Sequence, residues 1–336
     1  MSDRFDCYFV EKVDGEVRHS VAGIRLDDLP QGDVLIRVNW SSLNYKDAMA
    51  ARGHAGVVRQ FPHIPGVDIA GTVVESTSPA FRTGEQVLAC TYEIGSGRWG
   101  GWSEYARIPA AWVMPLPSGL TPRTSMCLGT AGFTAALCLE ALQHHGVHPG
   151  DGEILVTGAS GGVGSTAVML LSKLGYRVVA ASGKTALHAK LREWGAAEVV
   201  SRESILDSSS KPLLSGRWAG AVDTVGGEVL GTAIRQMRHS GCVAACGVAG
   251  GPQLPLTVYP FILRGVTLAG IEAAFYPMER RKRIWANLAE PWRLDRLEVL
   301  VEEADLRTLD PRIDAMLAGN IAGRILVRIR GDEKAG

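Results

Sequence analysis

Short apolar runs separated by polar turns dominate the first 120 residues of the chain. Turns at residues 13–15, 30–33 and 82–85 each carry a glycine beside charged or polar side chains. Several short strands at this spacing predict a barrel-like sheet. The predicted strands cover residues 5–10, 34–40, 69–76, 86–91, 102–108 and 112–116.

From about residue 120 the pattern changes to alternating helices and strands. Residues 121–143 predict a helix, a glycine break and a second helix. The alternation that follows predicts a doubly wound parallel sheet. Its predicted strands cover residues 154–156, 177–181, 198–200, 221–223 and 242–247, and its helices include residues 184–194 and 229–237.

The C-terminal part mixes both patterns. Residues 248–255 are rich in glycine and proline and predict a loop, and residues 260–270 predict a strand, a turn and a second strand. A helix with a basic cluster is expected at residues 277–288, a short helix at 313–317 and a last strand at 323–328.

A glycine-rich turn opens the alternating region, in residues 153–164 (EILVTGASGGVG). Gly158, Gly161 and Gly164 lie between a buried strand and a helical run, three residues apart. Such a turn lets a pyrophosphate approach the backbone and lets the helix pack closely on the strand. The context predicts a dinucleotide site at the helix N-terminus. The alternative is a tight turn in another α/β fold.

The end of the next predicted strand bears on which dinucleotide binds. An NAD site usually has an acidic residue there for the ribose 2′-OH, whereas this chain has Ser182, Gly183 and Lys184. Arg202, after the following strand, could close over the same phosphate. Each basic residue alone is more often a solvated charge, but together with the missing acid they favour NADPH over NADH.

Two polar loops of the first region are candidate site loops: residues 41–47 (SSLNYKD) and 65–71 (PGVDIAG). Their structural interpretation is simple. Asn44 could cap a helix over residues 48–52, Asp47 could favour its first turn, and the second loop could be a tight turn.

Composition excludes several classes of function. The 336 residues suggest two domains, and equal numbers of basic and acidic residues (35 each) give no sign of binding to nucleic acid or an anionic membrane. We expect no apolar run of the roughly 20 residues that cross a bilayer. The N-terminus lacks a signal-peptide pattern, which favours the cytoplasm. The six cysteines include no C-x-x-C pair, so no structural zinc site is expected.

Six motifs occur in order along nearly the whole chain: SSLNYKDAMA (41–50), IPGVDIAGTV (64–73), GGWSEYARIPAAWVMPLP (100–117), LGTAGFTAAL (128–137), TGASGGVGSTAV (157–168) and PFILRGVTLAGIEA (260–273). In this order they resemble the medium-chain dehydrogenase/reductase superfamily. Within it, the chain is most similar to the zinc-free quinone oxidoreductases, in particular the acryloyl-CoA reductase group.

The resemblance implies an α/β fold with two domains. A GroES-like β-barrel catalytic domain would span residues 1–120 and be completed by 265–336, and a Rossmann NADPH-binding domain with a doubly wound parallel sheet would span 121–264. It also implies a homodimer, with the strand near residues 261–268 at the sheet edge as a plausible partner for its symmetry mate.

The resemblance also assigns cofactor and catalytic residues. In the cleft, Tyr45 would position nicotinamide and substrate and deliver a proton, Asn44 would hold the ribose or carboxamide, and Asp47 would order the loop beside Lys46. The pyrophosphate residues would be Ser160, Gly161, Gly162 and Val163; the 2′-phosphate residues Ser182, Gly183, Lys184 and Arg202; and the nicotinamide residues Val248, Ile262 and Tyr45.

No metal is expected. Zinc alcohol dehydrogenases of the superfamily carry Cys where this chain has Asn44, and His-Glu where it has Val67 and Asp68. A catalytic zinc needs about three protein ligands, so hydride transfer from NADPH to a polarised acceptor remains.

The expected activity is NADPH-dependent reduction of an activated C=C bond in a small molecule, acryloyl-CoA or another short enoyl-CoA. A quinone is the alternative acceptor, and a non-catalytic NADPH-binding sensor or structural protein is the alternative of a different class. The basic cluster at residues 280–283 would favour coenzyme A if it faced the cleft. Residues 271–273, and Arg98 and Trp99, depart from the family pattern.

Overall fold

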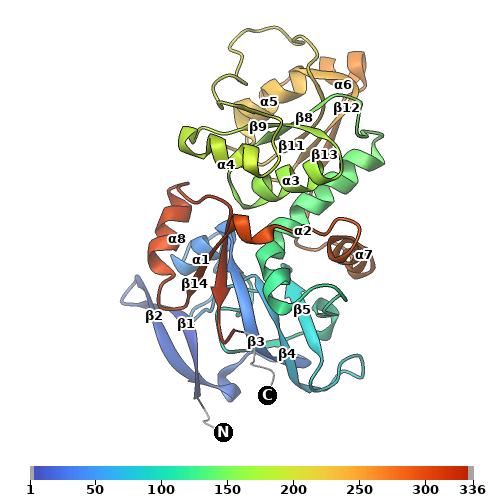
Figure 1. The fold of residues 1–336 in the computed structure, drawn as a ribbon. Coiled ribbons are helices and arrows are strands. Elements are labelled where there is room, and N and C mark those ends of the chain that lie inside the picture. The colour runs from blue at the N-terminus through green and yellow to red at the C-terminus, as the bar shows by residue number, and fades with distance from the viewer. Residues whose placement is uncertain (1–3, 332–336) are drawn as a thin grey trace. The chain divides into compact units, whose positions relative to one another are not determined.

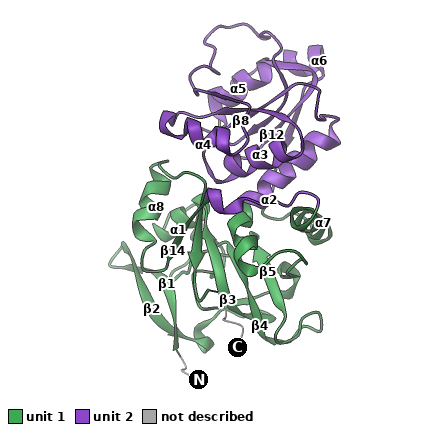
Figure 2. Ribbon diagram, viewed as in Figure 1, with its two compact units in different colours: residues 1–130, 274–290, 301–336 green, residues 131–273, 291–300 purple. Residues whose placement is uncertain are grey.

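The computed structural model describes residues 4–331. The chain forms two compact units (Figure 2). Unit 1 comprises residues 1–130, 274–290 and 301–336, and unit 2 comprises residues 131–273 and 291–300. The domain division expected from the resemblance, with boundaries after residues 120 and 264, stays a prediction about functional domains.

Unit 1 is built on a seven-stranded sheet beside a hairpin (Figure 1). The hairpin pairs β1 (Arg4–Val13) with β2 (Glu16–Arg25). The sheet has the order β14-β15-β3-β4-β5-β7, and β6 pairs with β3. Its strands are β3 (Val34–Leu43), β4 (Asp68–Ser76), β5 (Gln86–Cys90), β6 (Tyr105–Ile108), β7 (Met114–Pro115), β14 (Val301–Asp305) and β15 (Arg324–Arg328).

Three helices accompany this sheet: α1 (Tyr45–Ala51), α7 (Met278–Ala289) and α8 (Asp310–Leu317). An apolar cluster that includes Tyr8, Leu43, Ala48 and Leu309 joins the hairpin, β3, α1 and α8. The predicted strands of this region are confirmed apart from their ends. Strands β2 and β14 were not predicted, because their side chains are mostly exposed and therefore carry little apolar periodicity.

Unit 2 contains a six-stranded sheet in the order β10-β9-β8-β11-β12-β13, in which every pair of neighbours is parallel. This confirms the predicted doubly wound sheet. The strands are β8 (Glu153–Thr157), β9 (Arg177–Ala181), β10 (Glu198–Val200), β11 (Trp218–Asp223), β12 (Met237–Ala245) and β13 (Thr267–Gly270); the helices are α3 (Gly162–Lys173), α4 (His188–Glu193), α5 (Gly227–Arg235) and α6 (Tyr259–Arg264).

The prediction of two strands in residues 260–270 was wrong in its first half. This stretch forms α6 and then the edge strand β13. Pro260 lies in the first turn of α6, where its missing N–H is not needed, and Gly265 ends the helix in the left-handed conformation. An apolar run this short does not distinguish a strand from a helix.

Helix α2 (Pro122–His144) passes from unit 1 into unit 2. The predicted glycine break is confirmed, because Gly129 interrupts the helix with φ 51° and ψ −153°. Contrary to the sequence expectation, α2 is long and apolar enough by length and composition to cross a membrane. However, 83% of its most apolar window is buried inside the protein, as in a core helix.

All six cysteines are free thiols, and five of them are buried. Burial raises the pKa of Cys7 to about 12 and that of Cys242 to about 11, and raises the pKa of Cys90 well above its usual value. A hydrogen bond with Cys246, together with burial, raises the pKa of Cys138. Cys246 alone is half-buried.

Candidate functional site

The first candidate loop ends in the N-terminal turn of α1, and the carboxylate of Asp47 organises it. Asp47 Oδ2 accepts a hydrogen bond from the Asn44 N–H at 2.8 Å, as in a helix-capping box. Asp47 Oδ1 accepts hydrogen bonds from the N–H groups of Gly66 (3.1 Å) and Val67 (2.7 Å). The structure thus joins the two candidate loops through one side chain.

Asp47 is completely buried. Desolvation, reinforced by the charge of Asp68, raises the pKa of Asp47 from 3.8 to about 7, although the N–H donors oppose the rise. Tyr45 lies at the surface of the same turn with 58% of its area exposed, and Lys46 is also exposed. The turn therefore has a buried polar side that fixes it and an open side that is available to a ligand.

Two residues of this buried side, Asp68 and Arg324, were not among the predicted site residues. Because β3 pairs antiparallel with both β4 and β15, the start of each of those strands lies beside the end of β3. Asp68 Oδ2 accepts hydrogen bonds from Ser42 Oγ (2.5 Å) and Asn44 Nδ2 (2.8 Å). Arg324 donates to Asn44 Oδ1 (3.1 Å) and Ser42 Oγ (2.9 Å).

Unit 2 has the expected glycine turn between β8 and α3. Gly158 has φ 58°, and a Cβ at Gly164 would overlap the Gly158 carbonyl, so both positions require glycine. The predicted pyrophosphate residues Ser160, Gly161, Gly162 and Val163 lie in this turn and in the first turn of α3. Free N–H groups at such a terminus suit a phosphate.

The predicted 2′-phosphate residues gather at the carboxyl ends of β9 and β10. Ser182 Oγ lies 3.3 Å from Ser160 Oγ and accepts a hydrogen bond from the Lys184 N–H at 3.2 Å. A Cβ at Gly183 would be 3.8 Å from the Arg202 guanidinium carbon. Burial lowers the pKa of the Lys184 ammonium, which an anionic ligand would counteract.

Of the two predicted nicotinamide residues of unit 2, only Val248 lines a cavity that the structure describes. Val248 lines a cavity of ≈ 450 Å³ with Gly226, Gly247 and Ile271, at the carboxyl edge of the sheet. Ile262 is not among the residues that line this cavity, and its side chain is exposed on α6. Its role at the nicotinamide stays a prediction. Cys246, also unforeseen as a site residue, lines the same cavity.

The basic cluster at residues 280–283 does not form one surface. Arg281 is buried, and its guanidinium donates hydrogen bonds to the carbonyls of Cys90 (3.2 Å) and Ala274 (3.3 Å). Lys282 pairs with Glu279 at 2.8 Å. Exposed arginines remain at positions 280 and 283.

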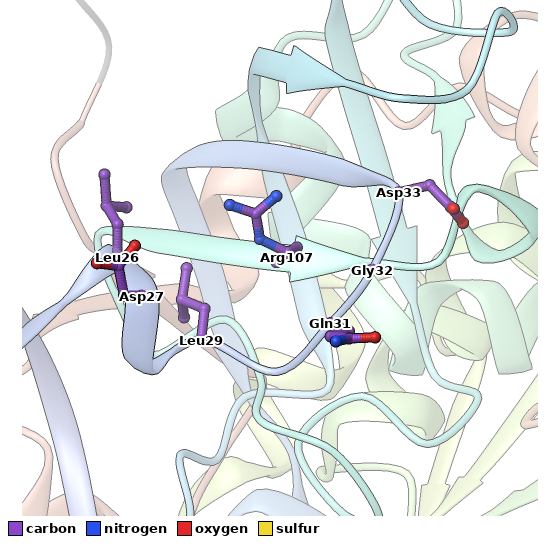
Figure 3. Close-up of a pocket in the computed structure, with 7 residues that line it drawn as sticks. All are labelled: Leu26, Asp27, Leu29, Gln31, Gly32, Asp33 and Arg107. Atoms are coloured by element: carbon purple, nitrogen blue, oxygen red, sulfur yellow. The ribbon is translucent and has the colours of Figure 1, made fainter.

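Arg98 and Trp99, which depart from the family pattern, have hydrogen-bond partners in unit 1. Arg98 donates to the Gln31 carbonyl, and Trp99 Nε1 donates to the Pro62 carbonyl at 2.8 Å. A hollow of ≈ 580 Å³ lies near this contact, open at the surface of unit 1 (Figure 3). It contains none of the predicted site residues; its lining comprises Leu26, Asp27, Leu29, Gln31, Gly32, Asp33 and Arg107.

Among residues 4–331, no group of three or more His, Cys, Asp or Glu side chains is arranged to hold a metal ion. The structure describes two candidate regions, one in each unit. Unit 1 has a hydrogen-bonded turn with an exposed tyrosine, and unit 2 has a glycine turn with serine and basic side chains at the neighbouring strand ends.

Comparisons with known proteins agree with both parts. Residues 30–118 match the alcohol dehydrogenase GroES-like domain, and residues 162–289 match the zinc-binding dehydrogenase family. The acrylyl-CoA reductase AcuI of Ruegeria pomeroyi is 42% identical over 97% of this chain and 99% of its own length. A relative in Escherichia coli K12, named as a probable acrylyl-CoA reductase, is 47% identical over 95% of this chain and 98% of its own.

A third relative is YhfP of Bacillus subtilis, whose name assigns quinone oxidoreductase activity provisionally; it is 43% identical over 98% of this chain and its entire length. The crystal structure of YhfP with NAD bound has a TM-score of 0.95, covering 98% of this chain and 100% of its own. That of Escherichia coli K-12 YhdH with bound NADPH has a TM-score of 0.92 at 47% identity, covering 96% and 100%. These whole-length matches show that the chain belongs to the medium-chain dehydrogenase/reductase superfamily, with its GroES-like and Rossmann-type folds.

Proposed function

We propose that this protein is a zinc-independent, NADPH-dependent reductase of an activated C=C bond, with acryloyl-CoA or another short enoyl-CoA as its acceptor. The observation that carries the proposal is the whole-length identity of 42% to an acrylyl-CoA reductase. The ordered turn at residues 44–47 supports it, because a protein that only bound the cofactor would not need this polar arrangement.

The residues of unit 2 fit NADPH. The turn at Ser160–Val163 offers backbone N–H groups for the pyrophosphate, and Ser182, Lys184 and Arg202 offer donors for a 2′-phosphate. No carboxylate follows β9, which disfavours the ribose contact of an NAD enzyme. When bound, NADPH supplies the hydride for the reduction.

The residues of unit 1 do not fit a catalytic zinc, although one matching family is described as zinc-binding. The resemblance puts Asn44 and Val67 where zinc enzymes carry Cys and His. An amide and an alkyl side chain cannot replace a thiolate and an imidazole. Asp68, next to Val67, is occupied by hydrogen bonds from Ser42, Asn44 and Thr130. The proposed mechanism therefore has no metal step.

In the mechanism that we propose, this chain's own residues manage charge and protons. Addition of hydride at the β-carbon of a conjugated thioester gives an enolate, with negative charge on the thioester oxygen. Hydrogen-bond donors would stabilise this oxygen, and the α-carbon must then receive a proton. The Tyr45 hydroxyl is an exposed donor of the turn. Asn44 would hold the ribose or carboxamide, and Asp47 keeps the turn in place, with Lys46 beside it.

A quinone is the second candidate acceptor, because YhfP is 43% identical along its whole length. The basic cluster gives limited support to coenzyme A as part of the substrate, since the Arg281 guanidinium already binds backbone carbonyls.

We further propose a cytoplasmic homodimer. Its support is the edge strand β13 and the exposed apolar side chains of α6 beside it in the sequence, which include Ile262 and Leu263.

The test follows NADPH oxidation at 340 nm with acryloyl-CoA, with a benzoquinone, and with NADH in place of NADPH. Faster turnover of acryloyl-CoA than of the quinone is expected; activity on the quinone alone would establish the alternative. Equal rates with NADH would contradict the proposed 2′-phosphate site.

We expect Tyr45→Phe to lower kcat by about 10²-fold if the hydroxyl delivers the proton; an unchanged kcat would remove this role.

A further inference from the structure

Three ionisable side chains are buried together in unit 1, although burying charge costs several kcal/mol per ion unless it is compensated. Asp47 and Asp68 are fully buried, and Arg324 is 2% exposed. Burial lowers the pKa of Arg324, while the charge of Asp68 opposes that change. The charges of Asp68 and Asp47 thus act on one buried guanidinium, close to Asn44, where the resemblance puts a zinc ligand of other family members.

The carboxamide of Asn44 lies between the two unlike charges. Its Nδ2 donates to Asp68 Oδ2 at 2.8 Å, and its Oδ1 accepts from Arg324 Nη1 at 3.1 Å. Rotating the amide by 180° would face its NH₂ group toward the guanidinium and its oxygen toward the carboxylate. Only one orientation of Asn44 is therefore compatible with these neighbours.

The same two residues hold the backbone on both sides of the interruption in α2. Arg324 Nε donates to the Cys127 carbonyl at 3.1 Å, and Asp68 Oδ2 accepts from the Thr130 N–H at 2.9 Å. Thr130 Oγ1 also donates to Asp68 Oδ1 at 2.6 Å. Gly129 lies between Cys127 and Thr130. Because it has no side chain, the Asp68 carboxylate and the Arg324 guanidinium can lie close to its backbone.

We propose that Asp68 and Arg324 are positioning residues that hold the Asn44 carboxamide, and with it the first turn of α1, in the arrangement that presents Tyr45 to the acceptor. This role rests on the proposed function, since it takes the α1 turn as part of the reaction site. Neither residue touches the acceptor. Both act through Asn44, the position at which the resemblance puts a cysteine in zinc-dependent members of the superfamily.

The test compares two buried arginines of unit 1 in the full-length protein. Arg324→Met removes the contact with Asn44, whereas Arg281→Met, the matched control, removes contacts with backbone carbonyls and the Tyr92 ring. We expect Arg324→Met to lower kcat by about 10²-fold, as for a misplaced reacting group. NADPH affinity, measured by fluorescence titration, should fall by less than about 10-fold, because the proposed pyrophosphate and 2′-phosphate residues all lie in unit 2 and stay intact.

Arg281→Met should have a kcat within about threefold of the wild-type value, because we expect this arginine to affect folding alone. This should hold even if its melting temperature falls as far as that of Arg324→Met. Arg324→Lys should restore part of the lost kcat because it keeps the charge. Equal losses of kcat in the two Met variants, or losses that follow the folded fraction, would make Arg324 merely structural. Asp68→Asn, which preserves shape, replaces Arg324→Met if the latter does not fold, and it should show the same loss.

A crystal structure of the variant separates this proposal from the proposed function. The Asn44 carboxamide should be rotated and the first turn of α1 displaced. An unchanged Asn44 and α1 would overturn the positioning role whatever the activity. If the wild type reduced neither acryloyl-CoA nor a benzoquinone, the proposed function would fail, while the altered Asn44 would still support the positioning role.

Discussion

At the scale of single residues, the candidate site depends on groups that stay polar while buried. Asp47 is the clearest case. It holds two loops together through four N–H donors, two from Asn44 and two from the backbone of residues 66 and 67. Its carboxyl group has no exposed surface, so ionisation is costly despite these donors.

Asp47 should make stability depend on pH in an unusual direction. Its folded pKa, about 7, is above the unfolded value of 3.8, so the folded state binds more protons between these values. The contribution of Asp47 to the unfolding free energy is then present at low pH and falls as pH rises from about 4 to about 7, by at most about 1.4 kcal/mol per unit. Asp47→Asn should abolish this slope in urea denaturation at pH 5 to 7.

Asp295→Asn is the control for that measurement, since Asp295 is an exposed carboxylate paired with Lys173. It should leave the slope unchanged. The opposite outcome would be an unfolding free energy of the wild type that rises with pH relative to that of Asp47→Asn. The N–H donors would then outweigh desolvation, and the pKa of Asp47 would be lowered in the folded protein.

The sequence could identify Asn44 and Asp47 as candidates because they follow a predicted strand and open a helix. It could not identify Asp68 and Arg324 in the same way. Each begins an apolar strand, and the two residues are more than 250 positions apart in the chain. Their meeting depends on the shared partner strand β3, and such long-range pairing leaves no mark on local pattern. A charged residue leading an apolar strand was the one local signal.

At the scale of secondary-structure elements, glycine positions decide where helices start, bend and stop. The β8–α3 turn and the break in α2 were both predictable, because a glycine within or beside an apolar run usually marks a turn or an interruption. The error in α6 has the opposite origin: its apolar residues suit either conformation, and only the flanking Pro260 and Gly265 indicate a short helix.

Gly129→Ala should lower the unfolding free energy by more than the strained backbone conformation of this position alone would cost. The φ and ψ of Gly129 cost a residue with a side chain about 1–3 kcal/mol. A new Cβ would also lie 2.5 Å from Asp68 Oδ2 and 2.8 Å from Arg324 Nη2. Gly319→Ala is the comparison, because its φ is 72° but no atom lies within 4 Å of the added Cβ. Urea denaturation should show the larger loss for Gly129→Ala; equal losses would mean that the contacts relax freely.

The ends of β9 and β10 should set the preference between the two nicotinamide cofactors. Lys184→Ala and Arg202→Ala should each raise the KM for NADPH by about 10-fold or more, as expected for the loss of a charge-assisted hydrogen bond, and leave that for NADH unchanged. Lys211→Ala, an exposed lysine of the same unit, is the control. Parallel changes for both cofactors would show that the variants alter the fold of the turn rather than a phosphate site.

At the scale of the whole molecule, each unit is assembled from separate stretches of sequence. Unit 2 includes residues 291–300, which return to it after α7. Two ion pairs hold this segment to unit 2, Asp295 with Lys173 at 3.3 Å and Arg296 with Glu193 at 3.1 Å. The sequence pattern provides no reason to expect this return, because ten residues with a few buried apolar side chains resemble any surface segment.

Assembly of two copies should depend on α6 and β13. Ile262, at 68% exposure, is the most exposed of the apolar side chains on α6. Ile262→Glu should convert the proposed dimer to a monomer in light scattering coupled to size exclusion, because a buried unpaired charge opposes association. Val299→Glu, another partly exposed apolar position of unit 2, should leave the mass unchanged. A monomeric wild type would contradict the proposed assembly.

The burial of five of the six thiols gains a meaning from the proposed acceptor. Conjugated thioesters and quinones are electrophiles that alkylate thiolates by conjugate addition, so an enzyme that turns them over is exposed to inactivation by its own substrate. The thiolate is the nucleophile in this side reaction, and the raised pKa values of Cys7, Cys90, Cys138 and Cys242 keep these sulfurs protonated. On the proposed function, the packing that stabilises the fold would also protect the enzyme from its own acceptor, and we expect Cys246, the half-buried thiol, to be alkylated first.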